Sequence, residues 1–155
     1  MEQKALPKFR ISNIELVSFK LDCAHQKDEK NKINFGVGVH TQLILQHNAL
    51  RVNMIFKISH ENKSDNICCE LSSSMDYEFE EKIKYIATKI DKEKMEAIIP
   101  KQIYATVVAI ALSTNRGILF SKLTGTPFEK EYCQIIDPNF FVDKEGKVDL
   151  IDKVK

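Results

Sequence analysis

The stretch that decides the fold is residues 33–59, INFGVGVHTQLILQHNALRVNMIFKIS. In its first half the apolar residues stand at odd positions, and from Leu50 onward they stand at even positions. A period of two is typical of a β-strand with one buried face. The polar residues 46–48 separate the two halves, so the stretch predicts two antiparallel strands joined by a short turn.

The alternation continues on both sides of this hairpin. After a polar turn at residues 60–66, alternate apolar residues up to Phe79 predict another strand. Before the hairpin, residues 9–23 are apolar in two different phases, which leaves two interpretations open. Either a β-bulge switches the phase, or both faces are covered, one by the domain's own core and one by a partner subunit. Residues 24–32 are polar and charged and predict a long solvated loop.

Beyond these strands the sequence favours helices. The apolar residues in the range 80–91 have helical spacing, although a strand could continue through Tyr85. Asp91 is of a type that caps the start of a further helix. Pro100 marks the entry to a long helix, because a proline costs little in a first turn, and Gly117 marks its end. This helix is apolar on almost all sides, which indicates burial against its own sheet and against another subunit.

Length and charge narrow the class of protein. The 155 residues suit a single domain, with a core at about residues 9–141 and a short charged extension at 142–155. A balance of 23 Lys and Arg against 22 Asp and Glu removes the compositional case for nucleic-acid binding. The start of the chain lacks the apolar region of a signal peptide, and the longest nearly apolar run is about half of a membrane span. We therefore expect a cytoplasmic protein that does not insert into membranes.

The usual signatures of catalysis and metal binding are missing from the sequence. The four cysteines have no CxxC spacing, so we expect them to be reduced and partly buried, with structural zinc or a disulfide as alternatives. His40, His47 and His60 lack ligand spacing. The glycines at 36 and 38 lie inside a strand pattern without a third glycine, which argues against a phosphate-binding loop. We expect no enzymatic activity, no cofactor and no metal.

Together these elements predict an α+β fold, in which a four-stranded antiparallel sheet is followed by a long helix packed on it. Five short motifs accompany them in order: Phe9-Arg10-Ile11, Cys69-Glu70-Leu71, Ile98-Ile99-Pro100, Asn115-Arg116-Gly117 and Asp137-Pro138-Asn139-Phe140. In these motifs and in the order of its elements the chain resembles the SecB-type protein-export chaperones. The resemblance covers about residues 9–141, and the order of the motifs carries it.

The resemblance implies a protomer that assembles as a dimer or a dimer of dimers and holds unfolded or extended polypeptide clients without ATP. A client groove of this kind needs apolar, sequence-tolerant surface. The candidate peptide-binding residues are Phe35, Phe56, Phe120, Leu123, Phe128, Phe140 and Phe141. Each could instead fill the core, and for Phe35 and Phe56 the core is favoured. The candidate oligomer-interface residues are Ile14, Leu16, Tyr104, Val107, Val108 and Ala111.

The sequence also departs from the family pattern. Family members usually carry a second long helix and an acidic tail at the C-terminus, and residues 142–155 are too short and too mixed in charge for either. Docking on the translocase motor is therefore doubtful. A chaperone dedicated to one client, such as an antitoxin, fits the sequence as well as a general export factor does. The alternative function is an oligomeric adaptor on the same fold that holds one folded partner.

Overall fold

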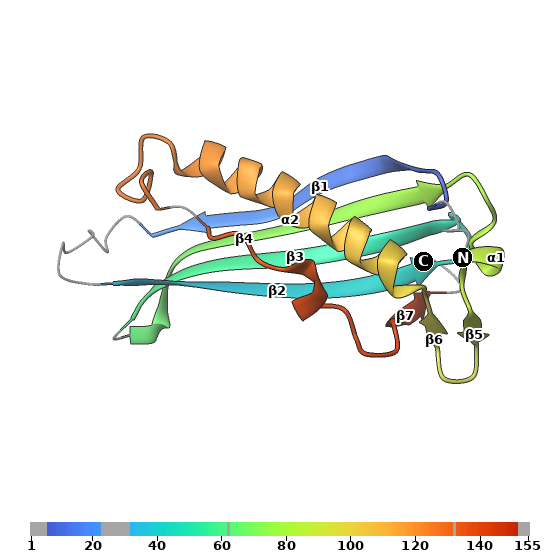
Figure 1. Ribbon diagram of the computed structural model, residues 1–155. Helices are drawn as coiled ribbons and strands as arrows, with labels where there is room; N and C mark the ends of the chain where they lie inside the picture. The colour runs from blue at the N-terminus through green and yellow to red at the C-terminus, as the bar shows by residue number, and fades with distance from the viewer. Residues whose placement is uncertain (1–5, 23–31, 62, 132, 152–155) are drawn as a thin grey trace.

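The computed structural model describes residues 6–22, 32–61, 63–131 and 133–151. Its strands are β1 (Phe9–Leu21), β2 (Ile33–Ile44), β3 (Ala49–His60), β4 (Lys63–Phe79), β5 (Lys89–Asp91), β6 (Glu96–Ile98) and β7 (Lys147–Ile151). Its helices are α1 (Ile83–Ile86), α2 (Lys101–Leu123) and the short 3-10 helix η1 (Pro138–Phe140). The described residues form one seven-stranded sheet in the order β1-β4-β3-β2-β7-β6-β5, with α2 lying across one face (Figure 1).

The expected four-stranded antiparallel sheet is wrong, because the sheet is larger and mixed and the molecule is mostly β. The additional strands come from segments that the sequence analysis gave to helices or to a charged extension. β7 belongs to that extension; it pairs parallel with β2 and antiparallel with β6. The turn before β7 depends on Gly146, whose φ of 76° favours glycine and where a Cβ would collide with the carbonyl oxygen of Ile99.

The hairpin of β5 and β6 replaces the helix that was expected to start at Asp91. The Asp91 carboxylate accepts a hydrogen bond from the Lys94 backbone N–H at 3.1 Å, as a helix cap would. Met95 then adopts a φ of 53°, a left-handed conformation that closes a turn and cannot continue a helix. The helical spacing in residues 80–91 yields only the single turn of α1.

The long strands follow the predicted alternation. β2 and β3 pair antiparallel without a break from Ile33↔His60 to Ile44↔Ala49, around the predicted turn. β4 begins at Lys63, earlier than predicted. Odd-numbered residues of β2 and even-numbered residues of β3 lie on the side covered by α2, where the core is.

Two bulges explain the mixed phase of the first strand. The register of β1 against β4 shifts between Ile11 and Asn13 and again between Leu16 and Ser18. Each extra residue reverses the alternation, so Ile11, Ile14 and Leu16 all pair with β4 residues that face α2. The bulge interpretation is therefore confirmed. Of the loop predicted at 24–32, nearly all lies outside the described residues.

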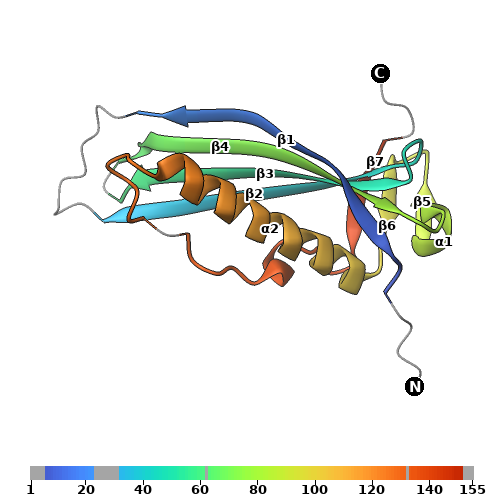
Figure 2. The same cartoon turned by 90° about the horizontal axis from the view of Figure 1, so that it is seen from above.

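α2 crosses the sheet diagonally and continues through Gly117 to Leu123, beyond its predicted end (Figures 1 and 2). Asn115 lies inside the helix, and its side-chain amide forms hydrogen bonds to α2 and to the sheet. Its Nδ2 donates to the Ala111 carbonyl oxygen at 2.8 Å, and its Oδ1 accepts from the Ser73 hydroxyl of β4. By length and hydropathy alone α2 could cross a bilayer, but core helices share these properties, and one face of α2 is packed on the sheet.

Candidate functional site

The structure sorts the seven predicted peptide-binding residues into three groups. Three are fully buried and fill the core: Phe56, Leu123 and Phe128. Two are half-buried and pack against that core: Phe35 and Phe141. The remaining two, Phe120 and Phe140, are 55% and 86% exposed and offer surface to a ligand. The core was correctly favoured for Phe56.

The two exposed rings belong to elements that contact each other, α2 and η1. Phe120 is near the end of α2, Phe140 is on η1, and the segment between them returns beside the helix (Figures 1 and 2). Ile135 lies on this returning segment, is 85% exposed and was not predicted. We refer to Phe120, Ile135 and Phe140 as the apolar rim. An isoleucine in an irregular segment carries no periodicity that could have shown its exposure.

A cleft of about 340 Å³ lies between α2 and the returning segment. Its lining consists of Ser113, Arg116, Gly117, Leu119, Phe120, Glu131 and Cys133. Gly117 leaves free space in this wall of the cleft, since no atom lies within 4 Å of the place where a Cβ would stand. Burial raises the pKa of the Cys133 thiol, so this side chain presents a neutral, weakly polar surface. The cleft can thus accept an apolar side chain beside the ring of Phe120.

The predicted interface residues fall into two groups, one on α2 and one on β1. The four on α2 are buried inside the chain's own core: Tyr104, Val107, Val108 and Ala111. The helix looked apolar all round because its outer side carries small residues such as Ala105 and Ala109, which are half-buried within the chain itself. Ile14 and Leu16, in contrast, are 50% and 39% exposed on β1. The interface prediction therefore rests on β1 alone.

β1 is an edge strand with an open side. It stands at the end of the strand order, and its outer edge pairs with no other strand in the described ranges. Ile11, Ile14 and Leu16 face the side of the sheet that α2 covers, yet they remain exposed, and we refer to them as the β1 strip. α2 approaches β1 again farther on, where Lys122 Nζ lies 5.8 Å from the Phe19 ring centre.

The opposite face of the sheet is polar, and three of its carboxylates are paired with bases. Three ion pairs join neighbouring strands there: Arg51–Asp76 (2.7 Å), Lys57–Glu70 (3.6 Å) and Arg10–Glu78 (2.8 Å). Each of these three carboxylates therefore has a basic partner within the sheet. The ladder also keeps this face soluble over the long strands β1, β3 and β4.

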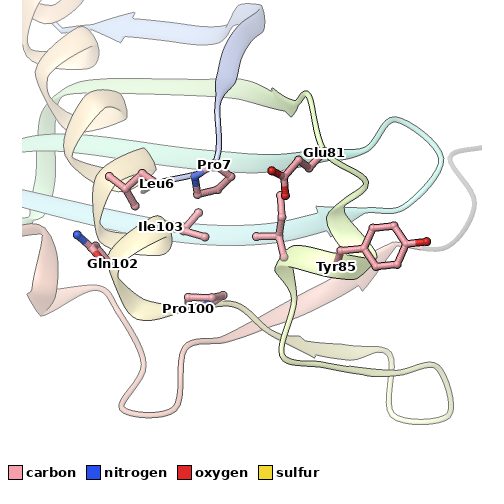
Figure 3. Close-up of a pocket in the computed structure, with 8 residues that line it drawn as sticks. Leu6, Pro7, Glu81, Tyr85, Pro100, Gln102 and Ile103 are labelled. Carbon is pink, nitrogen blue, oxygen red and sulfur yellow. The ribbon is translucent and has the colours of Figure 1, made fainter. Parts of the chain in front are cut away.

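A second cavity, of about 410 Å³, lies near the start of α2 (Figure 3). Its lining comes from the N-terminal segment, α1 and α2: Leu6, Pro7, Glu81, Tyr85, Ile86, Pro100, Gln102 and Ile103. The lining contains no Ser, Cys or His that could act as a nucleophile. This cavity offers mainly apolar binding surface, and no residue in it indicates a particular occupant.

Three cysteines are described, and all are buried: Cys68, Cys69 and Cys133, while Cys23 lies outside the described residues. In the part of the chain that the structure describes, no group of three or more His, Cys, Asp or Glu side chains is placed to hold a metal ion. Comparison with known proteins finds no matching family model and no curated sequence that matches. The functional argument therefore depends on the surfaces described above.

Proposed function

We propose that this protein is an ATP-independent chaperone that binds unfolded or extended polypeptides in the cytoplasm, as SecB-type chaperones do, without catalytic activity. The observation that carries the proposal is the apolar rim, three large exposed apolar side chains, of which Phe120 also lines the cleft. Exposed apolar surface that groups in this way marks interaction sites in soluble proteins. An extended client can place one side chain in the cleft and others against the rim.

The rim supplies only part of the binding energy. Burial of a whole Phe side chain is worth about 1.5–3 kcal/mol, so covering the exposed parts of Phe120 and Phe140 gives roughly 3 kcal/mol. Micromolar affinity needs about 8 kcal/mol, so further contacts are required. Main-chain hydrogen bonds to a sheet edge are the sequence-independent contacts that a general polypeptide binder can add.

Assembly is the second part of the proposal. The outer edge of β1 presents unpaired backbone groups over a strand of 13 residues, and the β1 strip beside it is exposed. Pairing with a second copy through β1 would satisfy those groups and cover Ile14 and Leu16. Docking on a translocase motor is not part of this proposal, because the carboxylates Glu70, Asp76 and Glu78 on the polar face are already paired.

The proposal is tested by light scattering from a reduced, unfolded client diluted out of denaturant, without nucleotide. Wild-type protein is expected to suppress scattering at a fixed ratio to client. The double variant Phe120→Ser, Phe140→Ser should need at least tenfold more protein, since each 1.4 kcal/mol corresponds to a factor of ten. Ile55→Ser is the matched control, because this side chain is 42% exposed but lies on β3, on the face of the sheet opposite the core.

Two results would contradict the proposal. One is a double variant that suppresses scattering as well as wild type does while its native mass is unchanged. The other is a wild-type protein that suppresses no scattering with several unrelated clients. The second result would favour an oligomeric adaptor with one folded partner, which a pull-down with the wild-type chain would then identify.

A further inference from the structure

A polar cleft of about 280 Å³ lies at the sheet edge where β2 separates from β7. β7 pairs with β2 over residues 42–44, so the preceding residues of β2, from Val39 to Thr41, line the opening. The other walls come from β6, β7 and the turn before β7, and Tyr104 of α2 closes the inner side. None of these residues belongs to the apolar rim or to its cleft.

Two buried hydroxyl groups form the inner side of this polar cleft. Thr41 and Tyr104 are 2% and 5% exposed. Burial raises the pKa of the Tyr104 phenol, and the neighbouring Thr41 hydroxyl lowers it. The contact is not a hydrogen bond of ordinary geometry, and Thr41 Oγ1 has no other hydrogen-bond partner in the described residues. A buried hydroxyl without a hydrogen bond is unusual in a folded protein and has unused capacity to bind a ligand.

The outer walls of the polar cleft are acidic. Glu96, Asp143 and Asp149 contribute carboxylates, and Lys147 contributes one positive charge that pairs with Glu96 at 2.6 Å. Asp149 Oδ2 lies 2.7 Å from Nε2 of His40. Burial is the main cause that raises the pKa of the Tyr104 hydroxyl, and the charges of Asp143 and Asp149 raise it further.

Among the three carboxylates of the polar cleft, Asp143 is the one without an ion pair in the described residues. Its Oδ1 accepts a hydrogen bond from the Glu145 backbone N–H at 2.8 Å and so holds the turn before β7. It forms no ion pair at contact distance within the described part of the chain, although its charge helps to raise the pKa of Lys147, after Glu96, whereas Glu96 and Asp149 each lie within 2.7 Å of a basic group. A positively charged ligand would be attracted to the Asp143 carboxylate.

We propose that this cleft binds a guanidinium or primary ammonium group. Such a group carries several N–H donors, which can serve the oxygens of Thr41 and Tyr104, and a positive charge that matches Asp143. An anion would be repelled by the three carboxylates, and an apolar group would leave Thr41 Oγ1 without a partner. The group can belong to an Arg or Lys side chain of a polypeptide or to a small free cation.

The test is isothermal titration calorimetry on the full chain with four probes. Nα-acetylargininamide represents the free cation and the blocked tripeptide acetyl-Gly-Arg-Gly-amide represents the polypeptide source, so that the guanidinium is the only charge on each probe. Their counterparts in which citrulline replaces arginine keep the shape but lack the charge. We expect binding of one or both arginine probes and at least tenfold weaker binding of the citrulline probes, because a charged hydrogen bond is about twice as strong as a neutral one.

Two variants separate the roles of charge and hydroxyl. Asp143→Asn keeps an oxygen for the turn but loses the charge, and we expect about tenfold weaker binding. Thr41→Val keeps the shape and removes the hydroxyl. Binding should fall about as much, while the melting temperature should change little, because that oxygen makes no hydrogen bond of ordinary geometry. Glu93→Gln is the matched control, since it removes one exposed carboxylate from the nearby β5–β6 turn, outside the cleft.

The outcomes decide the proposal in either direction. Binding of both arginine probes shows that the cationic group is sufficient, and binding of the tripeptide alone assigns the site to polypeptides. Equal binding of the citrulline probes overturns the proposal, as does a loss in Glu93→Gln that matches the loss in Asp143→Asn. Absence of binding by all four probes to the folded chain overturns it as well. None of these results depends on client capture at the apolar rim.

Discussion

Asn115 is the polar residue that fastens α2 to the sheet, and its removal gives the sharpest prediction for stability. The side chain is fully buried, donates to the Ala111 carbonyl oxygen and accepts from the Ser73 hydroxyl, which is itself buried. Asn115→Ala removes these contacts, leaves the Ser73 hydroxyl unpaired and opens a small cavity. Costs of about 1–3 kcal/mol for the orphaned hydroxyl and about 1 kcal/mol for the cavity give roughly 2–4 kcal/mol in total.

Urea unfolding at fixed protein concentration measures this loss. With a slope of about 2 kcal/mol per molar, the midpoint should fall by about 1–2 M without a change of slope. Adding Ser73→Ala to Asn115→Ala should cost less than the sum of the single changes, because no buried hydroxyl is then left unpaired. Thr106→Ala is the control, since its hydroxyl donates to the Gln102 carbonyl oxygen on the exposed side of the same helix. A loss below about 1 kcal/mol, or strictly additive changes, would refute the reasoning.

Two further predictions concern α2 and the buried thiols. Gly117→Ala should raise the free energy of unfolding by about 0.5–1 kcal/mol, because Gly117 is helical, exposed and clear of neighbours; an unchanged or lower melting temperature would contradict this. Burial raises the pKa of Cys69 to about 11 from an ordinary 9.0, so its thiol favours folding below pH 9 and this contribution is lost as the pH rises toward 11. Between pH 9 and 11, the unfolding free energy of Cys69→Ala should therefore fall by about 2–3 kcal/mol less than that of wild type, as measured by urea unfolding. Equal losses in the two proteins would contradict this prediction.

Local patterns in the sequence were sufficient for the long strands and insufficient for the added ones. The alternation in β2 and β3 reflects one buried face, which each strand carries in its own residues. β7 is charged at two of five positions, and only Val148 and Leu150 are buried. Its strand conformation depends on pairing with β2, more than a hundred residues earlier, and on β6. No local window contains that information.

The candidate sites show the same limit. Phe128 and Phe140 lie in the same irregular stretch, yet one is fully buried and the other is almost fully exposed. The difference comes from the path of the chain beside α2, which no periodicity records. The polar cleft was missed for a related reason, because His40 and Asp149 are 109 residues apart and meet only through the pairing of β7 with β2. A search for ligand spacing within short segments could not have shown that these two residues are neighbours.

The positions of the two proposed sites constrain which clients would suit both. Phe120 and Tyr104 are sixteen positions apart on α2, a distance of about 24 Å along the helix axis, which an extended chain spans with about seven residues. Phe140 lies between these ends of the path, since Asp143 of the polar cleft follows it by three residues. A client that occupies both sites therefore needs an apolar cluster and, about seven residues away, a basic residue. Apolar character alone would be satisfied by the rim, so the polar cleft is the feature through which this chain would select among unfolded polypeptides.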